Sequence, residues 1–195
     1  VPLNSVTYLA YIICAIASAG YLFRRTLWWD SLAHSSAEVG TLTCALVLAT
    51  GSIWGRPVWN TWWEWGDVRI MSTLILFLMF LGYLALRRAF ESPQRAARPA
   101  AVVALIAVLD IPLINRSVEW WGNRTLHQKS TLSEFKIEDL TLFTLMFGIL
   151  ISLLVMTWLI LHRFRIAWLE HIEFEQGVQT AIEERRQIDI KEKQR

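Results

Sequence analysis

Five long apolar runs with almost no charge limit the possible folds of this chain more than any other feature. They cover about residues 5–23, 36–53, 69–86, 99–115 and 139–161. Each is close to the roughly 20 residues that a helix needs to cross the hydrocarbon core of a bilayer. Because backbone polar groups in lipid must bond within their own segment, and no alternating barrel strands are visible, the runs predict an all-α integral membrane protein with a bundle of five spans.

Two of these spans are less regular than the others. The second and fourth are interrupted by polar residues and proline, so their boundaries are open by several residues. Pro112 is expected to kink the fourth span rather than end it. Cys14 and Cys44 both fall inside spans, where packing is the expected role of a thiol.

The distribution of lysine and arginine predicts the orientation of the bundle. Thirteen of these cations fall after the first span, after the third span and in the C-terminal tail, whereas six fall in the two other connections. Cations accumulate on the cytoplasmic side of membrane proteins. The chain is therefore expected to be a multi-pass protein of the cytoplasmic membrane, with its tail inside and the loops 54–72 and 116–138 on the outer face.

The first outer loop is unusually rich in tryptophan, with five of the eleven tryptophans of the chain between Trp54 and Trp65. An aromatic belt at a membrane interface accounts for one or two such rings. A helix that begins at Pro57 would gather most of them on one half of its surface. We therefore expect a helix lying along the outer membrane surface, whose indole face holds Trp59, Trp62, Trp63 and Trp65.

Such an indole face can bind lipid headgroups, a quaternary ammonium group or a large planar ring system. A cage for a cation needs rings that converge around one point, and a single flat face does not supply them. A planar macrocycle fits a flat face best.

The second outer loop adds Trp120, Trp121 and His127 on the same predicted face. Neutral imidazole is a common axial ligand of haem iron, and haem is a planar macrocycle. A single loop histidine is more often not a ligand, but its position opposite the first loop favours His127 as a ligand of haem iron. His34 and Glu38 are explained by a local pair four residues apart. Asp110 lies inside a span, where it indicates either a functional site or a structural pair with Arg116.

The motifs resemble those of a known family. The segment WGRPVWNTWWEWGDVRIMS is similar to the Trp-rich "WWD" signature of haem-handling membrane proteins. GSIWGRP, together with SVEWW followed by TLHQ, resembles the CcmC subgroup, which serves cytochrome c maturation. The resemblance covers residues 1 to about 165.

This resemblance implies a six-span protein that holds haem b between two outer histidines and delivers it to a periplasmic haem chaperone. His127 matches the second histidine. The first precedes a Val-Pro pair in the family, and this chain starts with Val1-Pro2, so we expect the matching histidine and a further helix before Val1. The role is binding and delivery rather than catalysis, with assistance in attaching haem to the chaperone left open. ABC transporter subunits and a small membrane subunit are further partners that the resemblance leaves open.

The sequence departs from the family pattern at two positions. Gly66 separates Trp65 from Asp67, and Asn60 stands where glycine is common. Gly66 would end the surface helix and turn Asp67 back toward it. The expected haem-binding set includes arginines that can pair with propionates, and consists of His127, Trp54, Trp59, Trp62, Trp63, Trp65, Asp67, Trp120, Trp121, Arg56, Arg69 and Arg124.

The chain therefore divides into a membrane domain at 1–165 and a charged cytoplasmic tail at 166–195. The tail has the alternating charges of a solvated helix, and a frayed tail or a docking surface remains open. Nothing in it indicates binding to nucleic acid. Two other functions remain: a transporter or channel subunit with Asp110 and Glu38 along its path, and a scaffold whose tryptophans bind only lipid or protein.

Overall fold

The computed structural model describes residues 2–90, 92–120, 126–127 and 139–193, apart from the side chains of 117–119, 139, 188–189 and 191–193. The described part is built from six helices, and the protein is all-α there, as predicted. They are α1 (Pro2–Arg24), α2 (Leu27–Trp59), α3 (Val68–Ala89), α4 (Pro93–Val108), α5 (Asp110–Trp120) and α6 (Asp139–Lys193). Five segments are long and apolar enough to span a membrane, with α4 and most of α5 forming a single span.

Helix α1 lies at the centre of the bundle and packs against α2, α4 and α6. The crossing with α2 is close because Gly40 faces the ring of Tyr11, where a Cβ atom would lie 2.7 Å from the ring. Tyr11 then stacks on Phe80 of α3, with ring centroids 3.7 Å apart. Small residues allow helix backbones to approach closely in a membrane, where lipid is as apolar as the core.

Helix α4 contributes an alanine face to the same core. Its buried side chains are Ala96, Ala97, Ala100, Ala101, Ala104 and Ala107. They pack beside α1 and α3. Cys14 and Cys44 are buried in this core as free thiols, which confirms that they serve packing.

The fourth span is kinked, as its proline predicts. Helix α4 ends at Val108, the N–H of Leu109 donates to the carbonyl of Ile106 at 3.2 Å, and α5 begins at Asp110. A continuous helix would need an N–H from Pro112 for the carbonyl of Val108, and proline has none. The break therefore falls three residues before the proline.

The tryptophan-rich segment differs from the expected surface helix. Helix α2 continues through Pro57 to Trp59, and residues 60–67 form an irregular connection to α3. The helix ends because Asn60 adopts a left-handed conformation with φ 58°, which asparagine tolerates better than most residues. Gly66 consequently ends no helix and lies in a turn, where its N–H donates to Glu64 Oε1 at 3.1 Å.

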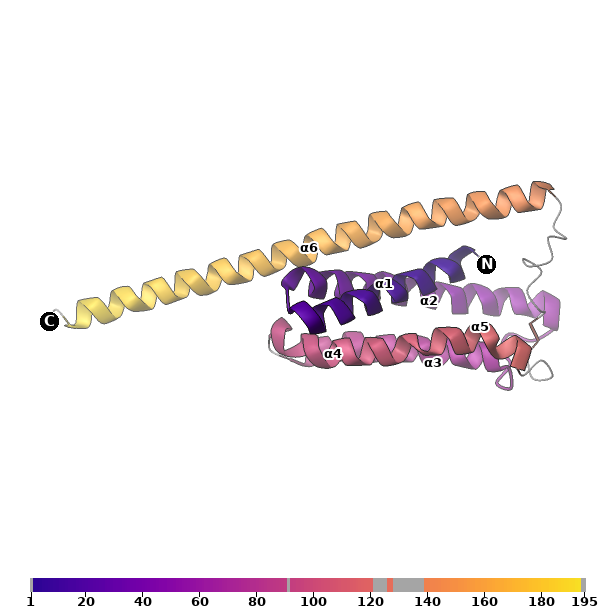
Figure 1. The fold of residues 1–195 in the computed structure, drawn as a ribbon, viewed down its shortest axis with the longest axis horizontal. Coiled ribbons are helices and arrows are strands. Elements are labelled where there is room, and N and C mark those ends of the chain that lie inside the picture. Colours follow the sequence, from indigo (N-terminus) through magenta and orange to yellow (C-terminus); the bar gives the residue numbers. More distant parts are fainter. Residues whose placement is uncertain (1, 91, 121–125, 128–138, 194–195) are drawn as a thin grey trace.

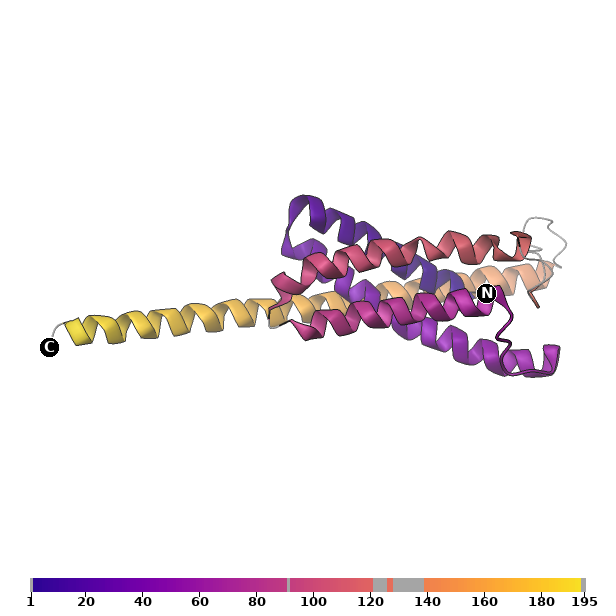
Figure 2. The ribbon, with the colours of Figure 1, turned by 90° about the horizontal axis from the view of Figure 1, so that it is seen from below.

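Helix α6 runs along the bundle for about half its length and then projects beyond it (Figures 1 and 2). Its 55 residues make a rod of about 80 Å at 1.5 Å per residue. The first part packs against α1 and α2. The helix continues to Lys193, so the charged segment after residue 165 extends the last span as a helix.

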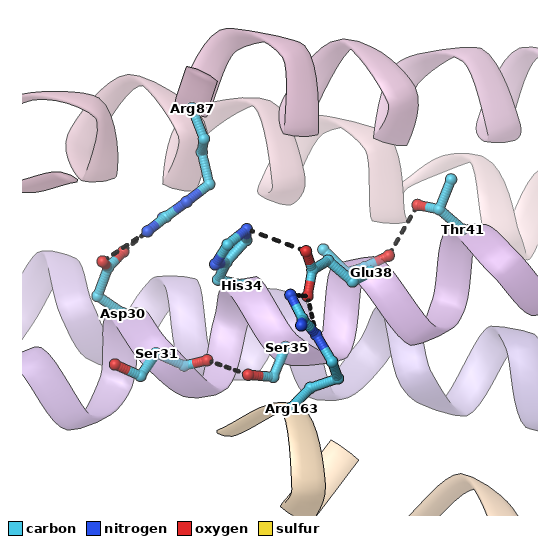
Figure 3. Close-up of polar contacts among 9 residues, drawn as sticks. Asp30, Ser31, His34, Ser35, Glu38, Thr41, Arg87 and Arg163 are labelled. Atoms are coloured by element: carbon cyan, nitrogen blue, oxygen red, sulfur yellow. Dashed lines mark hydrogen bonds and ion pairs between the residues drawn. The ribbon is translucent and has the colours of Figure 1, made fainter. Parts of the chain in front are cut away.

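Ion pairs join α2, α3 and α6 in the half of the bundle away from the connection 60–67 (Figure 3). Arg87 donates to both carboxylate oxygens of Asp30, at 2.6 and 2.7 Å. His34 lies 3.6 Å from Glu38, which confirms the local pair. Glu38 also accepts from Arg163 of α6 at 2.6 Å. These charges therefore fix neighbouring helices to one another.

Candidate functional site

A cavity of about 600 Å³ opens at the end of the bundle where α2 meets α3. Its volume falls in the range of about 300–1,000 Å³ that is usual for ligand sites. Helices α1, α2 and α3, the connection after α2 and two residues of the second loop form its walls. The lining consists of Leu3, Asn4, Tyr8, Val47, Leu48, Thr50, Gly51, Ser52, Trp54, Gly55, Trp59, Thr61, Trp62, Trp63, Glu64, Arg69, Ile70, Thr73, Leu126 and His127.

Hydrogen bonds fold the tryptophan-rich connection back over α2. Ser52 donates its hydroxyl proton to the carbonyl of Trp62 at 2.7 Å. Thr61 donates to the carbonyl of Trp63 at 3.0 Å. Close approach at Gly55 also matters, because a Cβ there would lie 3.2 Å from the Thr61 carbonyl. These contacts keep the indoles near the cavity without a surface helix.

Edge contacts join two of the tryptophans to the histidine. Trp54 and Trp59 meet edge to face with ring centroids 5.2 Å apart. Trp59 in turn lies 4.8 Å from the ring of His127. Such edge-to-face geometry is a favourable aromatic arrangement. The imidazole therefore packs against Trp59, which itself packs against Trp54.

Asp67 binds the second loop to the start of α3. Its side chain is fully buried, and its Oδ1 caps α3 by accepting from the N–H of Ile70 at 3.0 Å. Its Oδ2 accepts from the N–H of Leu126 at 2.7 Å and lies 3.3 Å from Nδ1 of His127. One carboxylate thus connects α3 with the loop that carries the histidine.

The surroundings of His127 favour neutral imidazole. Burial lowers the pKa of His127, and the cationic Arg69 acts in the same direction, while the Asp67 carboxylate opposes them. Iron binds the neutral ring through a nitrogen without a proton. The burial therefore keeps His127 in the form that can act as a ligand at neutral pH.

The cavity also contains groups suited to a carboxylate. Arg69 supplies a cation, and Nε1 of Trp63 is buried with no hydrogen-bond acceptor among the residues that the structure describes. A buried N–H without a partner is costly. A ligand carboxylate would satisfy this donor and pair with the guanidinium.

The structure brings together only part of the expected haem-binding set. The members that line the cavity are Trp54, Trp59, Trp62, Trp63, Arg69 and His127. Asp67 lies behind His127, and Trp65 is 72% exposed with its ring against Trp63. Trp120, at the end of α5, is 63% exposed. Trp121 and Arg124 lie outside the described residues.

Arg56 has a different environment from Arg69. Its guanidinium donates to the carbonyl and the side-chain oxygen of Asn60, at 2.8 and 3.1 Å. It stabilises the end of α2, and it does not line the cavity. Asp110 has no role in the cavity either, and its Oδ2 is buried without a hydrogen-bond partner in the part of the chain that the structure describes.

Sequence reasoning missed several polar residues of the cavity. Asn4 and Tyr8 come from α1, Ser52 from α2 and Thr73 from α3. All four are polar groups in or beside apolar spans, and this is the one signal that could have selected them. Nothing in the local pattern indicates that three separate helices turn them toward one cavity.

This architecture is that of a multi-pass helical membrane protein with an aromatic cavity at one end. The family model CcmC, described as "Heme exporter protein C", matches residues 1–179. The chain belongs to this family, in agreement with the resemblance of its motifs.

Curated relatives carry the same name. A Heme exporter protein C of Bradyrhizobium diazoefficiens is 46% identical over 132 residues, which are 68% of this chain and 49% of that protein. The Heme exporter protein C of Escherichia coli K12 is 40% identical over 158 residues, covering 79% of this chain and 62% of the relative. In Rhodobacter capsulatus the identity is 39% over 140 residues, with 72% of this chain and 57% of the relative covered. The chain thus spans about half to three fifths of these proteins.

Proposed function

We propose that this protein binds haem b in the tryptophan-lined cavity and delivers it to a periplasmic haem chaperone for cytochrome c maturation. The position of His127 is the main support. Its ring lies at the cavity, with its centroid 4.8 Å from that of Trp59. The name of the relatives, which refers to haem export, supports the same cargo. The role is one of binding and transfer, without catalysis by side chains.

Each part of haem has a suitable group in this cavity. His127 would bind the iron, because neutral imidazole is a common axial ligand. The indoles of Trp54, Trp59 and Trp62 would cover the macrocycle through stacking and edge contacts. Arg69 and the Trp63 N–H would receive a propionate, since both are donors and one is cationic.

Delivery needs a cargo that a partner can reach. Trp62 and Trp65, at the connection after α2, are 57% and 72% exposed. A cavity bordered by exposed indoles supports handover better than a haem enclosed on all sides, which would suit electron transfer. The proposed partners are the haem chaperone, ABC transporter subunits and a small membrane subunit.

The same proposal includes the orientation of the protein. The cavity end is placed at the outer face of the cytoplasmic membrane, and the projecting part of α6 in the cytoplasm. The excess of lysine and arginine at the other end of the spans supports it. The division into a membrane domain at 1–165 and a cytoplasmic tail at 166–195 belongs to the proposal as well.

A channel path is less well supported. It would need accessible carboxylates within the spans, whereas Glu38 is engaged by His34 and Arg163.

Haem titration of the purified protein in lipid nanodiscs tests the proposal. We expect a Soret band to grow to a stoichiometry of one haem per protein. His127→Ala should weaken binding at least tenfold, as expected for loss of an iron ligand. His171→Ala is the matched control, because His171 pairs with Glu175 on the projecting part of α6, and it should leave the titration unchanged. A wild-type protein without a Soret band, or equal binding by His127→Ala, contradicts the proposal.

A further inference from the structure

A carboxylate that is buried needs polar partners, and Asp67 has several. Its side chain has no exposed surface. Its oxygens accept from two backbone amides, those of Ile70 and Leu126, at 3.0 and 2.7 Å. The positive end of the α3 dipole also stabilises the charge. These contacts favour the ionised form, which can only accept hydrogen bonds.

The imidazole of His127 is positioned from two sides. Its Nδ1 lies 3.3 Å from Oδ2 of Asp67, and its ring meets the edge of Trp59. The N···O distance is slightly longer than that of most N–H···O hydrogen bonds. Leu126 precedes His127, and its backbone N–H donates a hydrogen bond to Oδ2 of Asp67. This bond fixes the backbone beside His127.

An ionised carboxylate determines which ring nitrogen carries the proton. Because Oδ2 can only accept, Nδ1 must be the donor in the neutral ring. Nε2 then has no proton, and it points away from Asp67 because the two nitrogens lie on different sides of the ring. A carboxylate behind a metal-binding histidine fixes its tautomer and raises its basicity.

We infer that Asp67 is the positioning residue that holds His127 as the Nδ1–H tautomer and so leaves Nε2 without a proton, the form that would bind a haem iron. The role of Nε2 as an iron ligand rests on the proposed function. The tautomer of His127 in the haem-free protein does not depend on it. Asp67, which is buried behind the ring, therefore acts through His127. The same contact connects the start of α3 to the loop that carries the ligand.

Two variants separate this role from the helix cap. Asp67→Asn keeps one oxygen to cap α3, but its NH₂ group cannot accept from Leu126 or from Nδ1. Asp67→Ser also caps a helix well, and it is too short to reach the imidazole. Both should fold, since Asn and Ser are good N-cap residues.

The first measurement uses the protein without haem. ¹⁵N NMR of labelled histidine should show His127 as the Nδ1–H tautomer in the wild type and a mixture of tautomers in both variants. Hydrogen exchange at the Leu126 amide should accelerate at least tenfold. A wild-type His127 in the Nε2–H tautomer, or unchanged ring shifts in Asp67→Asn, overturns the inference.

The second measurement is a double-mutant cycle for haem affinity. Asp67→Asn alone should raise the haem Kd about tenfold. In a His127→Ala background the same change should have almost no further effect, because Asp67 acts through that ring. An equal loss in both backgrounds indicates a structural role only and overturns the inference. If the wild type binds no haem, the proposed function fails, and the NMR result still decides the tautomer.

Discussion

The two ends of the bundle each contain a buried carboxylate, and the two carboxylates are satisfied differently. Asp30 faces a permanent cation, with both oxygens bonded to Arg87 at 2.6 and 2.7 Å. Asp67 receives neutral donors from two backbone amides and faces an imidazole. The first carboxylate is bonded to a guanidinium, while the second caps a helix and contacts the imidazole at the cavity.

This difference agrees with the packing around each residue. The α1–α2 turn beside Asp30 is closed, because Trp29 packs against Gly20, where an added Cβ would lie 2.6 Å from the indole. Near Asp67 the chain leaves helical structure and lines a cavity of about 600 Å³. One end therefore stabilises the bundle, and the other is available for a ligand.

Arg87→Met should cause the largest loss of stability. It would leave Asp30 buried without its cation, and breaking such a pair costs about 3–5 kcal/mol. Chemical unfolding in detergent micelles, followed by circular dichroism, measures the change. The double variant Asp30→Leu/Arg87→Met is the control and should recover most of the stability. A loss below about 1 kcal/mol for the single variant would show that the pair behaves like a surface pair.

Gly20→Ala should be the next most damaging change. The new methyl group would overlap the Trp29 ring, and overpacking of this kind costs about 1–3 kcal/mol. Gly82→Ala is the matched control, because a Cβ at Gly82 meets nothing within 4 Å. The melting temperature should fall for the first variant and stay level or rise for the second. Equal melting temperatures would mean that Trp29 moves aside for the added methyl group at little cost.

Ser52→Ala should have the smallest effect on stability and a local effect on the cavity. It removes the hydrogen bond to the Trp62 carbonyl, worth about 0.5–1.5 kcal/mol. Hydrogen exchange at residues 61–64 should accelerate, with the core of α1 unaffected. Ser152→Ala, which removes a hydroxyl bonded within α6, should leave residues 61–64 unchanged. Faster exchange throughout the bundle would show that the connection stabilises the whole fold.

Much of the fold could be predicted because lipid leaves a chain few choices. Uninterrupted apolar length, with backbone bonds satisfied inside each helix, is sufficient to predict the five spans. Pro112 predicts the kink through its missing N–H. The prediction of a surface helix was wrong. Periodicity alone could not show that Asn60 would end α2 in a left-handed conformation.

For the site, the sequence could predict which two segments take part but not which of their side chains meet. Tryptophan density selected the connection that lines the cavity, and the polar loop selected His127, which lines it too. The sequence could not separate Arg69, which lines the cavity, from Arg56, which bonds to Asn60. Charge and position near a membrane are the same for both, and their different partners depend on where α2 ends.

The sequence by itself determined a helical membrane bundle, a tryptophan-rich end and a histidine in the opposite loop, because composition and hydrophobic length act locally. Tertiary structure alone decided that Asp67 would stand behind His127, 60 residues away along the chain. It also decided that α1, α2 and α3 would place polar side chains around one cavity. Such contacts depend on how helices pack and where they stop, and no local pattern of residues contains that information.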